Sequence, residues 1–521
     1  MLNLSITTFG GLFFAGYLLT AYMRSQRSPL NRIPTIGPSG LVTSYYGFVK
    51  SLFYSREMLK EGYEKYYGGS FKIAMPTHWM VMVTGPKLTD ELRRAPEDQL
   101  SSIDAIGEGI QVDYTLGKEF RENNYHISSV RTMSRHLDAM FPDMQDEIAA
   151  TFSELVPAKE GEWLSVPANN IIAQAVCRAN NRLFVGLPFC RDSEYLYLNI
   201  NYTMTAVKTG HLLAHIPVFL RPAVSRILNS AESSKQLAVR LLGPMIQDRL
   251  EKFERHGSMN YPDRPNDFIT FLLEHSEPRH RTVRDMATRI LIINFVAIYT
   301  TVMAMTHILY DLASRPEYAE PMRQEIISII QDEGWSKSSI GKMHKVDSFV
   351  HESQRLSPPN MIALLRRAVK DYTFSDGTTI PAGQYVCATA HMIHTDQDNY
   401  SNPEKFEGFR FADLRDGDRE SSRHQATSVG LDYLIFGGGY HTCPGRFSAV
   451  LLMKTMLCHI LLNYDVKVVE GSPPKTWSLG VLVMPDHNAH VLFRRRNFFN
   501  AMVREQHELS AFVFLHVRYI I

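Results

Sequence analysis

The sequence predicts a mainly α-helical fold with small β-sheets, in which one large domain follows an N-terminal membrane-spanning helix. Three observations support this fold class. Apolar residues recur at three- and four-residue spacing over most of residues 50–360. Strand-like patterns are confined to a few short segments, and residues 6–22 are almost wholly apolar. No repeat of constant length is present, so a solenoid or propeller is not expected.

The composition is that of a globular protein with a sizeable core. Hydrophobic residues make up 45% and charged residues 21% of the 521 residues. The 55 basic and 54 acidic residues leave a net charge of +1, which gives no reason to expect a nucleic-acid partner. The five cysteines are scattered and form no spaced pair, a pattern that favours a reducing compartment over a disulfide framework.

The N-terminal segment has the composition of a membrane anchor. Its first 23 residues carry no charge, and spanning a bilayer takes about 20 apolar residues. A cleaved signal peptide is the alternative, but it would carry basic residues before the apolar run, whereas Arg24, Arg27 and Arg32 follow it. Because positive charge stays on the cytosolic side, we expect residues 1–24 to be an uncleaved single-pass anchor with the main domain in the cytosol.

Behind the anchor we expect a linker, a helical region and short strands. Three prolines and two glycines at residues 28–40 predict a stiff linker, which we place at residues 25–45. The polar stretch at residues 413–432 is expected to be a surface loop. The segments with helical patterns are 146–156, 238–256, 293–305, 317–334 and 445–464, and those with strand patterns are 71–75, 79–85, 372–386 and 481–493.

One short segment, FGGGYHTCPGR at residues 436–446, has the composition of a ligand-binding loop. Its three consecutive glycines remove side chains, so the backbone can lie flat against a bulky planar group. Cys443 is followed by Pro444, and proline favours the first position of a helix. Free N–H groups at a helix start would stabilise a thiolate, and a thiolate on a rigid loop suits an axial ligand of haem iron.

At these positions the chain resembles the cytochrome P-450 family, most closely the fungal monooxygenases of specialised metabolism. Six residues match the family signature F-G-x-G-x-[RH]-x-C-x-G: Phe436, Gly437, Gly439, His441, Cys443 and Gly445. The resemblance implies the cytochrome P-450 fold, with haem b bound beside Phe436 and Cys443 as the iron ligand. We place the haem domain at residues 46–496 and leave residues 497–521 as a tail without an assigned role.

Two other interpretations of the cysteine are weaker. Cys443 and His441 could form half of a zinc site, but no second close pair of ligands follows. Cys443 could be a hydrolase nucleophile with a histidine base, which leaves the glycines and the anchor unexplained.

A pair of opposite charges extends the resemblance. Glu352 and Arg355 are three residues apart and so lie on one face of a helix. A surface ion pair is the ordinary interpretation, but the flanking residues indicate burial. The family has this E-x-x-R pair and a third member in an F-R-F segment, which here is Arg410. The resemblance therefore implies that these three residues hold the Cys443 loop in a structural role.

The apolar segment INFVAIYTTVMAM, residues 293–305, is the third point of resemblance. Such a helix is buried, and its hydroxyl groups need partners. It aligns with the family's helix on the distal side of haem, where A-G-x-[DE]-T-[TS] is typical, which implies that Thr300 orients dioxygen and its protons. Two residues depart from that pattern, because Tyr299 replaces a carboxylate and Ala297 replaces glycine. Without the cysteine motif, back-bonded threonines in a core helix would be preferred.

Haem propionates need cationic partners. The candidates are His126 and Arg131, in the region that resembles the family's helix C, together with Arg366 and His441. The spacing of the first two departs from the family, which often has a tryptophan four residues before the arginine. Arg367 is the substitute for Arg366, and for every candidate a solvated surface charge is the alternative.

The function implied by the resemblance is that of a haem-thiolate monooxygenase in the endoplasmic reticulum membrane. It would use O2, and electrons from NADPH through a separate NADPH–cytochrome P-450 reductase, because the chain has no Gly-rich dinucleotide fingerprint. Its substrate would be a lipophilic small molecule such as a terpenoid, admitted past an apolar segment at residues 211–224. Residues expected to line the pocket are Phe295, Ile298, Ile362, Ala363, Leu364 and Leu479.

Two alternatives remain open for the function. A haem-thiolate isomerase or dehydratase would need no O2, and the tyrosine at position 299 keeps this alternative in place. A non-catalytic haem-binding membrane protein would bind haem without responding to substrate.

Overall fold

The computed structural model describes residues 29–40, 43–75, 78–214, 216, 218–228, 231–257, 261–417 and 421–496. The predicted anchor at residues 1–24 and the predicted tail at 497–521 lie outside these residues, as does part of the predicted linker.

The fold is mainly α-helical with small β-sheets, which confirms the predicted fold class. The predicted helical segment 238–256 lies within α12, the segment 146–156 lies within α8 except for its last residue, and the segment 317–334 contains all of α15 and begins two residues before it. The helices are α2 (Thr43–Phe53), α3 (Ser55–Lys65), α4 (Gly85–Arg94), α5 (Ser102–Gly109), α6 (Val112–Thr115), α7 (Tyr125–Arg135), α8 (Leu137–Leu155), α9 (Ala168–Phe184), α10 (Ser193–Ala214), α11 (Arg221–Leu228), α12 (Ala231–His256), α13 (Phe268–His275), α14 (Val283–Ser314), α15 (Ala319–Glu333), α16 (Lys337–Lys342), α17 (His344–Leu356), α18 (Ala390–His394), α19 (Arg410–Gly417) and α20 (Arg446–Asn463).

The strands form small sheets. In the five-stranded sheet the order is β1-β2-β8-β5-β3, with β2 and β8 parallel and the other pairs antiparallel. A three-stranded sheet has the order β4-β12-β9, and β6-β7 and β10-β11 are two-stranded. The strands are β1 (Ser70–Ala74), β2 (Trp79–Val83), β3 (Leu100–Ser101), β4 (Leu164–Pro167), β5 (Ala363–Ala368), β6 (Tyr372–Thr373), β7 (Thr379–Ile380), β8 (Tyr385–Ala388), β9 (Tyr464–Val468), β10 (Trp477–Leu479), β11 (Leu482–Met484) and β12 (His490–Arg495).

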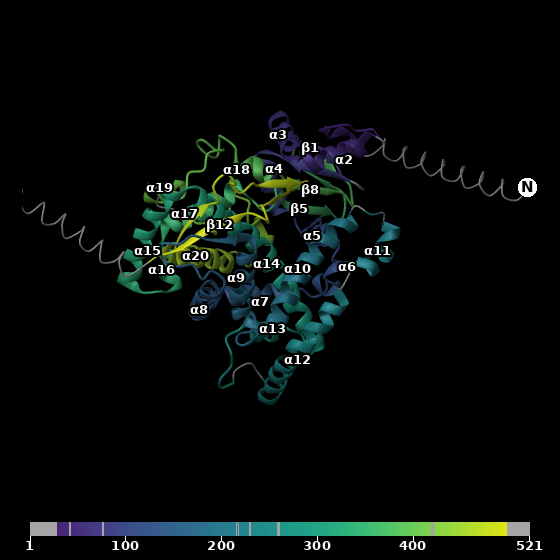
Figure 1. Cartoon of the computed structure of the whole chain (residues 1–521). Helices are drawn as coiled ribbons and strands as arrows, with labels where there is room; N and C mark the ends of the chain where they lie inside the picture. The colour runs from purple at the N-terminus through teal and green to yellow at the C-terminus, as the bar shows by residue number, and fades with distance from the viewer. Residues whose placement is uncertain are drawn as a thin grey trace, which may run out of the picture.

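The helix α14 runs through the centre of the domain. It contacts α9, α10, α12 and α17, and Figure 1 shows it between the five-stranded sheet and the helices α7, α12 and α13. Among the described residues, α14 and α20 are long and apolar enough to cross a membrane. Both are mostly buried inside the domain, so their apolar composition is explained by core packing.

The expectation of a surface loop at residues 413–432 is wrong for part of that stretch. It begins inside α19, where the buried guanidinium of Arg415 forms an ion pair with Asp347 of α17. Lys454 of α20 contacts the same carboxylate over 2.9 Å. Burial alone would raise the pKa of Asp347, but the two cations lower it to about 2. The polar composition of this stretch therefore includes a buried charge cluster that fixes α19 to α17 and α20.

Candidate active site

The loop that carries Cys443 folds back on itself before α20. The N–H group of Cys443 donates to the Phe436 carbonyl oxygen over 2.9 Å, and residues 439–441 form a 3-10 turn, η8 (Gly439–His441). Gly439 has a φ of 67°, and a Cβ atom there would lie 2.4 Å from the Arg93 carbonyl oxygen at the end of α4. Glycine is therefore required at this position by the backbone conformation and by the approach of α4.

The sulfur of Cys443 lies at the start of α20, where backbone N–H groups point toward it. Burial raises the pKa of the Cys443 thiol, while the N–H groups of Gly445 and Arg446 and the Arg446 guanidinium act in the opposite direction. The donors are those expected from the sequence, although α20 begins at Arg446 and Gly445, rather than Pro444, precedes its first residue. Because burial outweighs the donors, a thiolate here needs a positive partner such as a metal ion.

Arg366 of β5 is a buried cation with donors to spare. Its side chain donates to the Ser102 hydroxyl over 3.2 Å and to the Leu365 carbonyl oxygen over 3.0 Å. Its Nε and one Nη have no hydrogen-bond partner among the described residues, and burial lowers the pKa of this guanidinium to about 10. Two unpaired buried donors on one guanidinium are what a carboxylate would satisfy.

Arg131 and His441 lie near this guanidinium. The Arg131 guanidinium is 5.9 Å from the centre of the Tyr440 ring, and His441 Nε2 is 2.8 Å from a carboxylate oxygen of Glu97. The pKa of His441 is lowered by burial first and then by Arg366 and Arg131, against the opposing effect of Glu97. The structure thus brings three of the four predicted propionate partners into one electrostatic neighbourhood.

His126, the fourth candidate, is held elsewhere. Its Nδ1 atom is 3.0 Å from a guanidinium nitrogen of Arg289 in α14, and the ring is buried. Burial and this neighbouring charge lower the pKa of His126 to about 3, so the ring is neutral. With Nδ1 next to the Arg289 guanidinium, the neutral ring carries its proton on Nε2, and the contact of His126 with a propionate stays a prediction.

A β-bulge in β5 sets the direction of the Arg366 side chain. Ala363 pairs with Ala388 and Arg366 pairs with Val386, so β5 has one more residue than β8 between these two pairs. The extra residue turns the side chains of Ala363 and Arg366 to the same face of the sheet, whereas a regular strand would place them on opposite faces. Leu364 lies inside the bulge, buried, with a φ of 54°.

The middle of α14 has one open face. Val296 is 45% exposed and Thr300, one turn later, is also exposed, although the flanking turns of this helix are buried. Phe295 and Ile298, predicted to line the pocket, are instead buried against the core, and so is Leu364. The Thr300 hydroxyl donates to the Val296 carbonyl oxygen over 3.1 Å.

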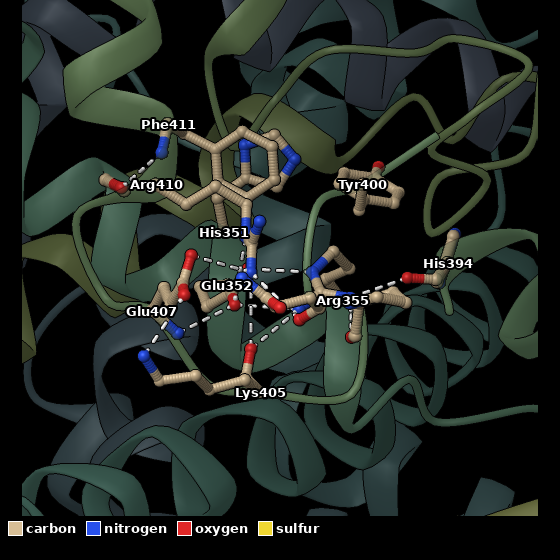
Figure 2. A network of polar contacts seen from close by, with 12 residues as sticks. His351, Glu352, Arg355, His394, Tyr400, Lys405, Glu407, Arg410 and Phe411 are labelled. Carbon is tan, nitrogen blue, oxygen red and sulfur yellow. Dashed lines mark hydrogen bonds and ion pairs between the residues drawn. The ribbon is translucent and has the colours of Figure 1, made fainter. Parts of the chain in front are cut away.

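The triad of Glu352, Arg355 and Arg410 is assembled in the interior, as Figure 2 shows. Arg355 donates to both carboxylate oxygens of Glu352, over 2.7 and 2.8 Å, and Arg410 Nε lies 3.3 Å from one of them. The side chains of Glu352 and Arg355 have no exposed surface. The backbone N–H of Glu407 donates to the same carboxylate over 2.9 Å. The three side chains therefore form a buried network, and this network orders the segment from α18 to α19.

Comparison with known proteins decides the family. A model of the family described as cytochrome P-450 matches residues 41–493, which is most of the chain.

The chain belongs to the cytochrome P-450 family.

Its relatives among curated proteins are fungal. Cytochrome P-450 monooxygenase 103 of Postia placenta is 40% identical over 91% of this chain and 95% of its own length. Cytochrome P-450 monooxygenase olcJ of Penicillium canescens is 33% identical over 85% of this chain and 84% of its own length. The solved structure of a retinoic acid-bound cyanobacterial protein, CYP120A1, superposes with a TM-score of 0.67 over 89% of this chain and 99% of that one, at 18% identity, and so shares the fold. The predicted family and enzyme class, a cytochrome P-450 monooxygenase, are confirmed by these relatives.

Haem iron is the cofactor of this family, and the residues present in this chain fit it. Cys443 offers a sulfur supported by backbone N–H groups, and Arg366 offers two buried donors to a propionate. The exposed face of α14 offers an apolar surface. The zinc alternative finds no support, since no group of three or more His, Cys, Asp or Glu residues within the described part of the chain could hold a metal ion.

Two residues near the site were missed by the sequence analysis. Glu97 accepts hydrogen bonds from the backbone of Ser102 and Ile103 while it contacts His441, and so joins the Cys443 loop to α5. Arg289 is fully buried and holds His126. Neither residue has a local motif. Glu97 meets His441 and Arg289 meets His126, and each partner is more than 100 residues away in the sequence.

Proposed function

We propose that this cytochrome P-450 inserts one oxygen atom of O2 into a lipophilic small molecule of secondary metabolism, such as a terpenoid. Electrons would come from NADPH through a separate NADPH–cytochrome P-450 reductase. The observation that carries the proposal is the open face of α14, where the apolar Val296 and the hydroxyl of Thr300 are exposed between turns of the helix that are buried. Fungal relatives named as monooxygenases support the reaction class, and the retinoic acid in the CYP120A1 structure supports an apolar substrate.

The residues of the chain would divide the work between binding and proton handling. Cys443 would hold the iron, while Arg366, Arg131 and His441 would bind the propionates. When bound, haem supplies the activation of O2. Because the Thr300 hydroxyl hydrogen is donated to Val296, its oxygen remains free to accept a proton-carrying hydrogen bond. Burial raises the pKa of Tyr299, so this residue keeps its proton and cannot act as the base that a carboxylate at this position would be.

The function is tested with membranes that contain the enzyme and a reductase. Candidate terpenoids, fatty acids and aromatic polyketides are first screened for a substrate-induced shift of the haem spectrum. With an active candidate and isotopically labelled O2, we expect a product that carries one labelled oxygen atom and whose formation stops without NADPH. Turnover without NADPH and O2 would favour the isomerase or dehydratase. The haem-carrier alternative predicts no spectral shift with any candidate.

Thr300→Ala is expected to uncouple NADPH consumption from product formation. The substitution leaves Cys443 in place, so haem content and the carbon-monoxide spectrum should be unchanged. Without the hydroxyl, a smaller share of the electrons reaches product and the remainder appears as hydrogen peroxide. We expect the ratio of product to NADPH to fall by as much as about a hundredfold, the lower end of the effect of a lost proton-transfer group. Thr300→Ser keeps the hydroxyl and is the matched control. An unchanged ratio in the alanine variant would show that protons take another route.

We further propose that the enzyme is anchored in the endoplasmic reticulum membrane by residues 1–24, with the domain in the cytosol. Exposed apolar side chains support a membrane-facing surface: Tyr46 and Phe53 on α2, Phe219 in the 3-10 turn η4 (Val218–Leu220) and Ile227 on α11. Phe219 is 80% and Ile227 is 84% exposed. Large apolar side chains that gather on a surface mark a site of contact with a membrane or another protein. Both α2 and α11 lie toward the right of Figure 1. The predicted membrane-dipping segment at 211–224 thus includes one of the most exposed phenylalanines described.

Removal of residues 1–24 should release a protein that still binds haem but no longer behaves as an integral membrane protein. Weak association with vesicles should remain and should be lost when Phe219→Ser and Ile227→Ser are added, because apolar side chains drive interfacial binding. Sedimentation with and without high salt measures both effects. If the truncated protein stayed integral, or if the two serines changed nothing, the anchor or the surface would be wrongly assigned.

A further inference from the structure

The buried triad does not hydrogen-bond the cysteine loop. Arg355 donates to the carbonyl oxygens of His394 and Pro403, each over 2.6 Å, and Arg410 donates to that of Ser401, also over 2.6 Å. Within the described part of the chain, no hydrogen bond joins Glu352, Arg355 or Arg410 to residues 436–443. An intermediary is needed for the triad to influence the iron ligand.

His394 is placed as that intermediary. It is the last residue of α18 and fully buried, and Figure 2 shows it beside Arg355. Its backbone carbonyl accepts from Arg355, and its ring Nε2 accepts from the backbone N–H of Leu434 over 2.9 Å. His394 therefore joins the triad to the segment that leads into the glycines of the cysteine loop.

From Leu434 the path reaches the cysteine in two hydrogen bonds. The Leu434 carbonyl oxygen accepts from the N–H of Gly437 over 3.0 Å, which closes the turn before the glycines. The carbonyl oxygen of Phe436, inside that turn, accepts from the N–H of Cys443 over 2.9 Å. A shift of Leu434 would thus move the acceptor that fixes the backbone of the iron ligand.

We propose that His394 is a positioning residue that transmits the order of the Glu352–Arg355–Arg410 triad to Cys443 through the N–H of Leu434. The proposal rests on Cys443 as the haem ligand and adds the residue that holds it.

The chemistry of the site agrees with this role. To accept at Nε2, the ring must be neutral with its proton on Nδ1. Burial, then His391 and Arg355, hold the pKa of His394 well below its usual range, so the neutral ring is favoured. Leu434 is buried, and so is its backbone N–H group. A buried backbone donor that loses its acceptor destabilises the protein by the full free energy of its desolvation.

Other contacts keep the neighbouring chain in place if the ring is replaced. The Tyr400 hydroxyl donates to the Asp432 carbonyl oxygen over 3.0 Å, and the Tyr433 hydroxyl lies 3.3 Å from the Gln354 side-chain oxygen. Loss of the His394 acceptor should therefore disturb the cysteine loop locally instead of unfolding α18 or α19.

The test compares amides that differ in reach. In His394→Gln the amide oxygen occupies the place of Nε2 and can still accept from Leu434, whereas in His394→Asn it is too short. His391→Asn is the matched control, because His391 is another buried histidine of α18, with its pKa lowered to about 3, and no hydrogen bond joins its ring to the cysteine loop within the described residues. Each full-length variant is reduced and exposed to carbon monoxide, and the ratio of thiolate-type to non-thiolate absorption is measured, with the rate of haem loss to apomyoglobin.

We expect His394→Asn to lower that ratio by roughly tenfold and to speed haem loss, while His394→Gln and His391→Asn stay near the unmodified enzyme. A normal ratio in His394→Asn would overturn the proposal, and so would an equal loss in the asparagine and glutamine variants or in the His391 control. If the unmodified enzyme itself lacked the thiolate-type absorption, the assignment of Cys443 as the iron ligand would fail instead, which separates the two conclusions.

Discussion

Cys443→Ala is expected to abolish both the thiolate-type absorption of the reduced carbon-monoxide complex and all product formation. Cys443 is the sulfur at the end of the glycine loop, and the N–H groups of Gly445 and Arg446 are directed to it. The loop fixes the position of this sulfur, because the N–H group of Cys443 donates a hydrogen bond to the Phe436 carbonyl oxygen. The loss should therefore be complete, and absorption spectroscopy of the reduced protein with carbon monoxide measures it.

Cys458→Ala is the matched control for this experiment. Cys458 lies in the same helix, α20, is fully buried, and contacts the Met343 sulfur over 3.4 Å. Its removal leaves a small cavity and should leave the spectrum unchanged. Persistence of the thiolate-type spectrum in Cys443→Ala would refute the whole assignment of the site.

Glu352→Ala and Arg355→Ala are expected to yield almost no haem-containing protein. Each removes one half of a bidentate pair with no exposed surface and leaves the other charge buried, at a cost of ~3–5 kcal/mol. Domains of ordinary stability have only roughly 5–15 kcal/mol in total. In Arg355→Ala, the carbonyl oxygens of His394 and Pro403 also lose their donor. Haem content per folded protein and the thermal midpoint measure the effect.

An exposed ion pair of similar length provides the control. Arg284 and Glu232 are 2.7 Å apart, and both side chains are more than half exposed. Arg284→Ala should change stability by less than about 1 kcal/mol. Near-normal haem content in both triad variants would mean that the buried network is dispensable, and the relay through His394 would then have no source.

Sequence reasoning reached the elements whose signal is local. Periodic apolar residues identified α8 and α12, and the glycine and cysteine pattern identified the loop before α20. Glu352 and Arg355 were found because their spacing puts them on one helix face, which is a property of four consecutive residues. Their third partner, Arg410, came from the family resemblance alone.

Properties that depend on packing between distant segments were not accessible in this way. The neighbours α9, α10 and α12 decide which face of α14 is open. Because the sequence does not show these neighbours, it predicts Phe295 and Ile298 as pocket residues and misses the exposed Val296. His126 was assigned by its position near Arg131, but its partner is Arg289, 163 residues later in the sequence. Arg415 was assigned to a polar loop because nothing local reveals the carboxylate of Asp347 that it meets.

The bulge in β5 decides which changes of length this strand can accept. Ala363 and Arg366 share one face of the sheet because β5 has one extra residue between them, while their partners Ala388 and Val386 lie two residues apart in β8. Deletion of Leu364, the residue inside the bulge, would leave Ala363 and Arg366 two residues apart with the same partners, and so on the same face. Substitution at Ala363 also keeps the register, and with it the direction of the guanidinium. A one-residue change in the regular part of β5 would instead shift the register and turn its side chains to the other face, so the bulge is the one place in this strand where evolution can change its length without moving the cation.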